Sequence, residues 1–259
     1  MQVMRTEIIY EDNDILVVYK PAGLPTQTAK LGQPDVVSQL KNHLKQPYLG
    51  IIHRLDQPVE GLLVFAKHKK AAADLTAQLQ CRGENGSLHK HYYAVVCGKT
   101  EQSQGRLVDY MYKSPENVAV IVDKPGCPVK KDGKQSQAEG RAKEAILEYH
   151  IVARQETAVG TIPAEDSEGK MLALADIHIL TGRFHQIRAQ MAHAGMPLLG
   201  DVKYGSEESK NLSRALRVQT VALCAYRLEF RHPVTKKSLC WVENPRGKSF
   251  GFFSKGDNK

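Results

Sequence analysis

A short charged segment between two apolar runs holds the first residues that could carry chemistry. It reads His53-Arg54-Leu55-Asp56 and lies in a predicted polar loop. The permanently cationic guanidinium of Arg54 would keep a partly desolvated Asp56 carboxylate ionised. An ionised carboxylate in such a place can act as a nucleophile or as a base. By itself, however, the string is more typical of a structural arginine–aspartate pair at a strand end.

A second group of chemically capable residues lies at a predicted strand-to-helix turn that begins at Thr181. It contains Arg183, His185, Gln186 and Arg188, and the three-residue spacing of His185 and Arg188 puts both on one helix face. Cations are unfavourable at a helix N-terminus unless an anion is bound there or nearby. The pattern therefore favours phosphate binding over a merely solvated basic turn.

A pair of tyrosines in a predicted strand offers a third candidate. In Lys90-His91-Tyr92-Tyr93, successive side chains point to opposite sheet faces, so only one of the two tyrosines can face a given site. A tyrosine ring that lines a basic pocket can stack on a nucleobase for about 1–3 kcal/mol. Ordinary packing in the sheet is the alternative interpretation.

Composition narrows the function classes. The chain has 259 residues, with 36 Lys and Arg against 28 Asp and Glu, and the net charge of +8 favours a polyanionic partner without proving one. The five cysteines are far apart and form no C-x-x-C pair, so neither a disulfide framework nor a zinc site is indicated. No apolar run approaches the roughly 18 residues of a membrane span, and the start lacks a signal-peptide apolar region. We expect a cytoplasmic protein.

Local patterns predict mostly strands, with three helices among them. The predicted helices cover residues 35–46, 68–81 and 185–194, and the predicted strands cover residues 8–10, 14–20, 50–52, 62–67, 91–97, 145–152, 172–180, 220–230 and 238–242. Residues 99–170 are the least readable part, where we expect an exposed polar loop or insertion. Without strict alternation of strand and helix, the pattern predicts an α+β fold: a mixed, largely antiparallel sheet with flanking helices. No linker is clear enough to divide the chain.

Together these segments closely resemble the RluA-type pseudouridine synthases, which isomerise uridine in structured RNA. The resemblance spans most of the chain. The matching segments are His53-Arg54-Leu55-Asp56 with Gly61-Leu62-Leu63-Val64-Phe65-Ala66-Lys67, Lys90-x-Tyr92-x-Ala94-x-Val96, Thr181-Gly182-Arg183-x-His185-Gln186-Ile187-Arg188, Gly195-x-Pro197-Leu198-x-Gly200-Asp201-x-x-Tyr204-Gly205, Leu223-Cys224-Ala225 with Phe230-x-His232-Pro233, and the opening Tyr10-Glu11-Asp12 with Val17-Val18-Tyr19-Lys20-Pro21-Ala22-Gly23.

The resemblance assigns roles to residues in these segments. It implies that Asp56 is the catalytic residue, that Tyr92 packs against the target base, and that Arg188 pairs with the aspartate. The residues that it implies for RNA binding are Arg54, Arg183, His185, Gln186 and Leu223. It implies a single catalytic domain over residues 1–259, with no metal and no cofactor, and ribosomal or transfer RNA as partner with no obligatory protein partner. Because the first motif begins within about ten residues of Met1, we expect no N-terminal S4-like domain.

The chain departs from the family pattern at a few positions. Val59-Glu60 stand where the family usually has Thr-Ser, Gln190 where a His is common, and Cys224 where a His is usual. None of these removes the catalytic candidates, but Glu60 adds a negative charge that could repel a phosphate or orient a neighbouring arginine.

Two other functions remain as alternatives. One is a non-catalytic RNA-binding module that keeps the fold, against which the intact Asp56, Tyr92 and Arg188 argue. The other is a hydrolytic glycosidase or nucleosidase, which usually needs a pair of carboxylates. Asp201 is the nearest candidate for a second carboxylate, and its position after a glycine favours a turn residue instead.

Overall fold

The computed structural model describes residues 5–28, 30, 32–81, 88–98, 101–123, 130–131, 134–135, 142–157 and 170–253. The chain divides into two compact units. The first holds residues 1–93 and 223–247, and the second holds residues 94–222 and 248–259. Each unit is therefore assembled from two separate stretches of sequence.

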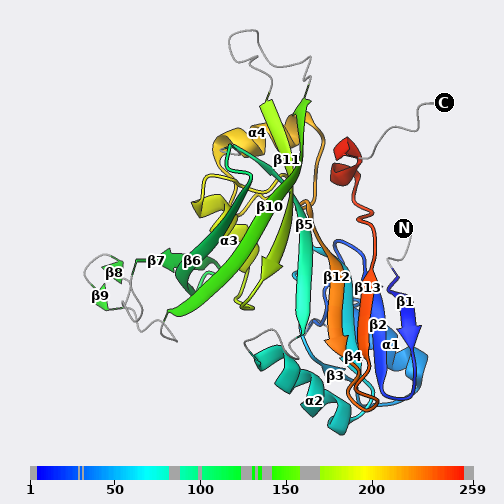
Figure 1. The fold of residues 1–259 in the computed structure, drawn as a ribbon. Helices are drawn as coiled ribbons and strands as arrows, with labels where there is room; N and C mark the ends of the chain where they lie inside the picture. The colour runs from blue at the N-terminus through cyan, green and yellow to red at the C-terminus, as the bar shows by residue number, and fades with distance from the viewer. Residues whose placement is uncertain are drawn as a thin grey trace, which may run out of the picture. The chain divides into compact units, whose positions relative to one another are not determined.

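The first unit is a mixed sheet with two helices (Figure 1). Its strands are β1 (Glu7–Glu11), β2 (Ile15–Lys20), β3 (Gly50–Ile51), β4 (Glu60–Ala66), β12 (Leu223–Arg231) and β13 (Ser238–Val242), and its helices are α1 (Val36–Leu44) and α2 (Lys69–Gln80). The order is β1-β2-β4-β12, with β13 on β12 and β3 on β4. Every pairing is antiparallel except that of β4 with β12, which is parallel.

The centre of this sheet is buried on both faces. Every residue of β2 and of β4 is buried, as expected for continuous apolar runs. One face packs against α2, where Ala71 and Leu75 join the cluster that contains Val17 and Leu62. The predicted start of the first helix is confirmed, because the Asp35 carboxylate accepts a hydrogen bond from the Ser38 backbone N–H at 2.6 Å.

A glycine permits the parallel pairing of β4 with β12. Gly61 has φ +122°, and a Cβ atom there would lie 2.4 Å from the backbone oxygen of Ala225. Any other residue would push the two strands apart.

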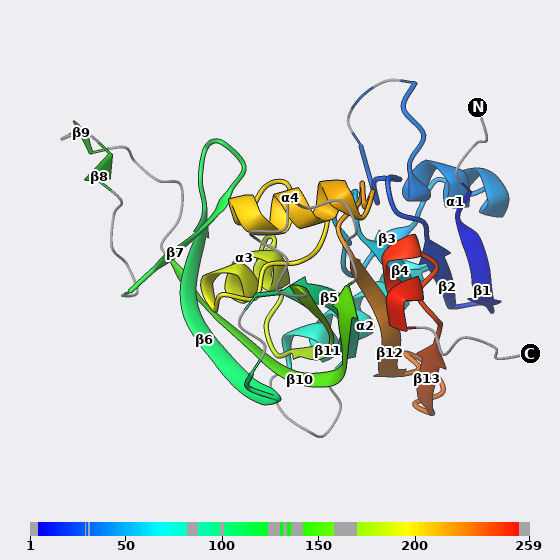
Figure 2. The same ribbon diagram turned by 90° about the horizontal axis from the view of Figure 1, so that it is seen from above.

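The second unit contains long antiparallel strands and two helices. Strand β5 (His89–Cys97) begins in the first unit and ends in the second; the other strands are β6 (Gln104–Lys113), β7 (Ala119–Val122), β10 (Lys143–Thr157) and β11 (Lys170–Ile179), with the short pair β8 (Lys130–Lys131) and β9 (Lys134–Gln135) apart from them. In the order β11-β10-β6-β7, each strand is antiparallel to the next, and Figure 2 shows β6 and β10 running side by side. The helices are α3 (Gln186–His193), α4 (Glu207–Ala215) and the 3₁₀ turn η2 (Lys248–Phe253).

The prediction of a loop over residues 99–170 needs correction. Residues 104–113 and 119–122 are strands, and the predicted strand at 145–152 extends over Lys143–Thr157. Strand β6 was missed because it is polar, with only Met111 buried, so it lacks the apolar run that marks a central strand. Within this range, residues 99–100, 124–129, 132–133, 136–141 and 158–169 lie outside the described residues. Within the described part of the chain, no helix is long and apolar enough to cross a membrane.

Candidate active site

The turn that carries Asp56 is fixed by hydrogen bonds on both sides of the residue. The Thr26 hydroxyl donates to the Leu55 carbonyl at 2.9 Å and accepts from the Leu55 N–H at 3.2 Å. On the other side, the Gln57 carbonyl accepts from the Gly23 N–H at 2.8 Å. Asp56 itself is half-buried. Its carboxylate is therefore held on a well-supported turn rather than on a free loop.

A buried lysine supports the same turn. Lys20, at the end of β2, has no exposed surface. Its ammonium donates to the carbonyl oxygens of Leu24 at 2.7 Å, Pro21 at 3.0 Å and Gln57 at 3.1 Å. Burial lowers the pKa of Lys20 to about 7, against the opposing influence of the negative charges of Asp56 and Glu60. Sequence reasoning missed this role, and its signal is a lysine that ends an otherwise apolar strand.

Tyr92 lies in β5, within the first unit, and is 5% exposed. Burial raises the pKa of its hydroxyl, and the negative charge of Asp56 raises it further, so the hydroxyl stays protonated. Tyr93 instead stacks on Tyr226, with ring centroids 3.7 Å apart. The two tyrosines have different surroundings, as the alternation of strand side chains predicts.

The remaining predicted residues of the first unit differ in exposure. Arg54 is exposed, whereas Leu223 is 4% exposed. His53 accepts the Val64 N–H through Nε2 at 3.4 Å, and burial, together with the charge of Lys90, holds its pKa well below the usual value. The imidazole is therefore neutral, and Arg54 is the cation that this segment presents to solvent.

In the second unit, Arg188 forms a buried ion pair with Asp201. The guanidinium Nε and Nη2 donate to the two carboxylate oxygens at 2.7 and 2.8 Å. Asp201 also accepts the backbone N–H groups of Lys203 at 2.9 Å and Tyr204 at 3.1 Å, which confirms it as a turn residue. Burial raises the pKa of Asp201, but Arg188 and these amides lower it more, so the net shift is downward.

Sequence reasoning missed the pairing of Arg188 with Asp201. Both residues were singled out, but nothing in the string shows that residues 13 positions apart meet. The predicted pairing of Arg188 with Asp56 remains a prediction, because the two residues belong to different units. Asp201 is committed to Arg188, which argues against the free second carboxylate that a glycosidase needs.

Gln186 shapes the turn before α3. Its side-chain oxygen accepts from the Thr181 hydroxyl and from the Arg183 N–H, each at 2.9 Å, and its amide nitrogen donates to the Ile146 carbonyl at 3.0 Å. The Arg183 guanidinium donates through Nε to the Glu144 carbonyl at 2.8 Å. Both ends of the Gln186 amide thus organise the basic turn itself.

His185 caps α3 in an unusual conformation. It has φ +53°, in the left-handed region, and makes no side-chain capping bond. Its ring stacks on Phe184, with centroids 3.7 Å apart, and its Nδ1 lies 2.7 Å from the Tyr204 hydroxyl. Strained backbone of this kind persists where surrounding contacts hold it, and it is common at functional sites.

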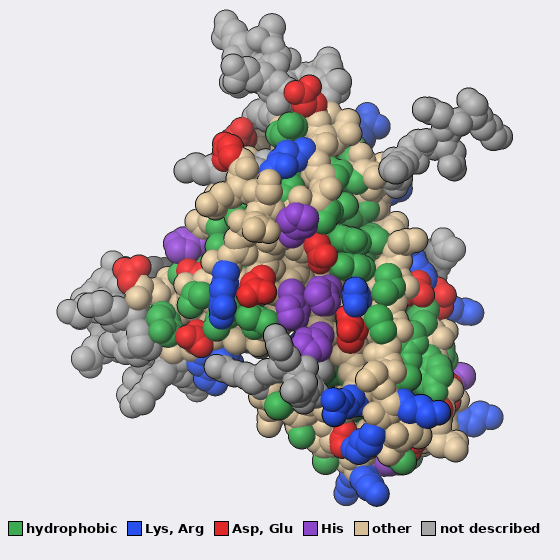
Figure 3. Space-filling view, viewed as in Figure 1, with side chains coloured by type: hydrophobic (Ala, Val, Ile, Leu, Met, Phe, Trp, Pro, Cys, Tyr) green, Lys and Arg blue, Asp and Glu red, His purple; other side chains and the backbone are tan. Residues whose placement is uncertain are grey.

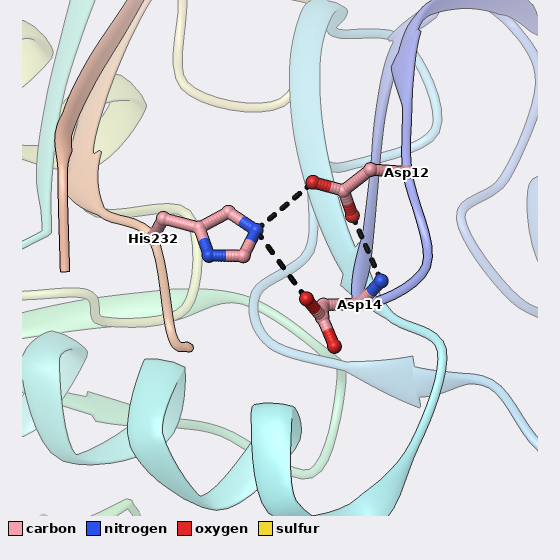
Figure 4. A group of neighbouring side chains, drawn as sticks. All are labelled: Asp12, Asp14 and His232. Carbon is pink, nitrogen blue, oxygen red and sulfur yellow. Dashed lines mark hydrogen bonds and ion pairs between the residues drawn. The ribbon is translucent and has the colours of Figure 1, made fainter. Parts of the chain in front are cut away.

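One group of carboxylate and imidazole atoms among the described residues is close enough to be considered as a cation site: Asp12, Asp14 and His232 (Figure 4). His232 Nδ1 accepts the backbone N–H groups of Val234 at 3.2 Å and Thr235 at 3.0 Å. The proton therefore lies on Nε2, which faces Asp12 at 2.9 Å and Asp14 at 3.7 Å. Both ring nitrogens are therefore used in hydrogen bonds, Nδ1 as an acceptor and Nε2 as a donor, and neither has a lone pair available for a metal ion. The three residues form a hydrogen-bonded link between two turns rather than a set of metal ligands.

Comparison with known proteins identifies the family. A family model described as RNA pseudouridylate synthase matches residues 14–193, which include Asp56, Tyr92 and Arg188. The chain belongs to the RNA pseudouridylate synthase family. Within it, the dual-specificity RNA pseudouridine synthase RluA of Vibrio parahaemolyticus is 32% identical over 232 residues, which are 88% of this chain and 78% of that protein. Ribosomal large subunit pseudouridine synthase D of Pseudomonas aeruginosa is 32% identical over 265 residues, which are 96% of this chain and 71% of that protein.

These likenesses make the chain an RluA-type pseudouridine synthase and therefore an isomerase. Among solved structures, human RNA Pseudouridylate Synthase Domain Containing 1 matches with a TM-score of 0.68 at 21% identity, covering 95% of this chain and 85% of that one. That match shows the fold. It confirms the predicted α+β architecture of the RluA-type synthases.

Proposed function

We propose that this RluA-type synthase converts uridine to pseudouridine within folded ribosomal or transfer RNA, and that Asp56 is its catalytic residue. The reaction detaches uracil from ribose C1′, turns it and rejoins it through C5. A C–N bond is exchanged for a C–C bond with no net redox change, so no cofactor is needed. The observation that carries the proposal is the Asp56 turn, which is held through Leu55 by Thr26 and through Gln57 by the buried Lys20.

An ionised carboxylate suits each step that this isomerisation can use. Asp56 can attack C1′ of the ribose, remove a proton from C2′, or add to C6 of the pyrimidine ring. In each case the carboxylate must stay in place while the uracil turns beside it. The bonds that fix Leu55 and Gln57 supply that rigidity.

The target uridine must leave its stack to reach Asp56, at a cost of a few kcal/mol that protein contacts offset. We assign Tyr92 and Leu223 to the face and wall of the flipped uracil. Arg54, Arg183 and His185 contact the RNA around it. We assign to Arg188 the role of keeping the Asp56 carboxylate ionised and positioned. Asp201 orients the Arg188 guanidinium.

The backbone of the RNA is held by charge that is spread over the surface. The net charge is +8. On the face drawn in Figure 3, Lys and Arg side chains are interspersed with Asp and Glu rather than gathered into one basic field. Such a distribution favours recognition of RNA shape at several separate phosphates, with an affinity that falls as salt rises. We further propose that the enzyme acts in the cytoplasm without an obligatory protein partner.

The test uses unmodified ribosomal and transfer RNA transcripts, incubated with wild-type enzyme or with Asp56→Asn. New pseudouridines are located by carbodiimide marking and reverse transcription, and RNA affinity is measured by filter binding. We expect reverse transcription to stop at discrete positions only after incubation with the wild type. For the transcript that the wild type modifies, the Kd of Asp56→Asn should stay within about twofold of the wild-type value. Pseudouridine formation by Asp56→Asn would refute the assignment.

A further inference from the structure

Glu60, one of the departures from the family pattern, is buried at the start of β4, four residues after Asp56. Its carboxylate accepts the Tyr19 hydroxyl at 2.8 Å, the Gly247 N–H at 2.8 Å and the Arg246 N–H at 3.3 Å. A side chain that is 5% exposed and holds three donors is not placed to repel RNA phosphates. It is instead a built element of the first unit.

A second departure lies directly beside it. Cys224 is paired with Glu60 in the register of β12 and β4, and its sulfur is 3.7 Å from the same Tyr19 hydroxyl. Burial and the Glu60 charge both raise the pKa of the Cys224 thiol, which therefore stays neutral. Tyr19 thus contacts both Glu60 and Cys224, and the small, neutral Cys224 side chain lies beside the buried Glu60 carboxylate.

The Glu60 carboxylate also holds the last residues of the first unit. Beyond the two backbone N–H bonds, the Arg246 guanidinium lies over the Tyr19 ring, 4.0 Å from its centroid. The guanidinium also bonds to Glu243 at 3.3 Å and to Glu7. The segment Arg246–Gly247 is therefore tied to the start of β4 through both its backbone and its side chain.

Lys20 links Glu60 to the catalytic turn. It follows Tyr19 in β2, is paired in the register of β2 and β4 with Gly61, the residue after Glu60, and donates to the Gln57 carbonyl, next to Asp56. The charged groups that act on Lys20 are Asp56 from the turn and Glu60 from β4, and both raise its pKa against the effect of burial. Glu60 thus favours the ammonium form, which donates to three carbonyls at once.

We propose that Glu60 is a positioning residue for the catalytic turn: it ties Arg246–Gly247 to β4 and shares with Asp56 the role of counter-charge to Lys20. The inference rests on the proposed role of Asp56 in catalysis. It assigns to Glu60 an effect on turnover rather than on RNA binding, because no atom of Glu60 needs to reach the substrate.

Two substitutions separate the two parts of this role. Glu60→Ala removes the charge and all the hydrogen bonds of the carboxylate, whereas Glu60→Gln removes the charge and only one of the two acceptor oxygens. Glu7→Gln is the matched control, because Glu7 is an exposed carboxylate that contacts Arg246 and does not act on Lys20. Each variant is assayed at a temperature where circular dichroism shows it fully folded. Turnover and KM are measured on an unmodified transcript that the wild-type enzyme is found to modify. The Lys20 side chain is titrated by ¹³C NMR without RNA.

We expect Glu60→Ala to lower kcat about tenfold or more, with KM within twofold of wild type. Glu60→Gln should lose less turnover, and its Lys20 titration should move down by about half a pH unit or more. Glu7→Gln should change neither. Wild-type kcat in Glu60→Ala, or an unchanged Lys20 titration in Glu60→Gln, would overturn the proposal. Activity in Asp56→Ala would refute the catalytic assignment instead, and the RNA-free titration is independent of that outcome.

Discussion

The buried ion pair of Arg188 with Asp201 allows a quantitative prediction. In Asp201→Asn, the remaining carbonyl oxygen can still accept from Arg188 Nη2 and from the amides of Lys203 and Tyr204. The new NH₂ group replaces the oxygen that accepts from Arg188 Nε at 2.7 Å, so two donors face each other. The guanidinium also loses its counter-charge at a position where the two side chains are 6% and 1% exposed.

Breaking a buried ion pair from one side costs about 3–5 kcal/mol, because an uncompensated charge stays buried. That is a large part of the roughly 5–15 kcal/mol that stabilises a typical domain. For a domain of this size, the loss corresponds to a decrease in Tm of about 6–20 °C. The lowered pKa of Asp201 adds a pH dependence: the stabilisation is present above the ordinary aspartate pKa and is lost as pH falls through the folded-state value.

The assay is urea unfolding at neutral pH, followed by circular dichroism. Asp109→Asn is a matched control, because Asp109 accepts from the neutral amide of Gln190 at 2.7 Å and lies 3.2 Å from His193. Removal of that charge should cost about 1 kcal/mol. If the two variants lose equal stability, the Arg188–Asp201 pair has no special weight and the reasoning is wrong.

Three further predictions concern the first unit. Tyr92→Phe keeps the ring and should retain turnover within about threefold, whereas Tyr92→Leu should lose about tenfold in single-turnover assays; equal losses would exclude stacking on the base. In urea titrations, Gly61→Ala should lower the free energy of unfolding by about 3 kcal/mol or more, because the added Cβ would meet the Ala225 backbone. Gly251→Ala is the control and should be nearly neutral, because no atom lies within 4 Å of the added Cβ. Burial lowers the pKa of Lys20 from 10.5 to about 7, so between these pH values Lys20 is protonated in the unfolded state and neutral in the folded state. The free energy of unfolding should therefore rise as pH increases from 7 to 10.5. The same rise with pH in Lys20→Met would contradict this.

Much of the fold could be predicted because its central elements follow simple patterns. The apolar runs of β2 and β4 and the capped start of α1 at Asp35 are local signals. Strand β6 could not be predicted in the same way, because its stability comes from pairing with β10 rather than from an apolar run of its own. The parallel contact of β4 with β12 joins residues far apart in sequence, and the sequence marks it only by Gly61.

In the candidate site, too, some residues could be predicted from local motifs and others could not. Asp56, Tyr92 and Arg188 were named from motifs in which residue type and spacing are informative. The supporting roles of other residues were not predicted: Lys20 reads as a strand end, Asp201 as a turn residue, and Glu60 as a charge that could repel a phosphate or orient an arginine. Their roles depend on burial and on partners that only the folded chain brings together.

The most direct test of the central claim is tritium release from RNA labelled at C5 of uridine, with wild-type enzyme and Asp56→Ala compared on unmodified total RNA. Rejoining uracil through C5 expels the label, so each product releases one tritium. We expect release by the wild type and none above background by Asp56→Ala. Release by both proteins, or by neither on any RNA class, would contradict the account of Asp56 as the catalytic residue of a pseudouridine synthase.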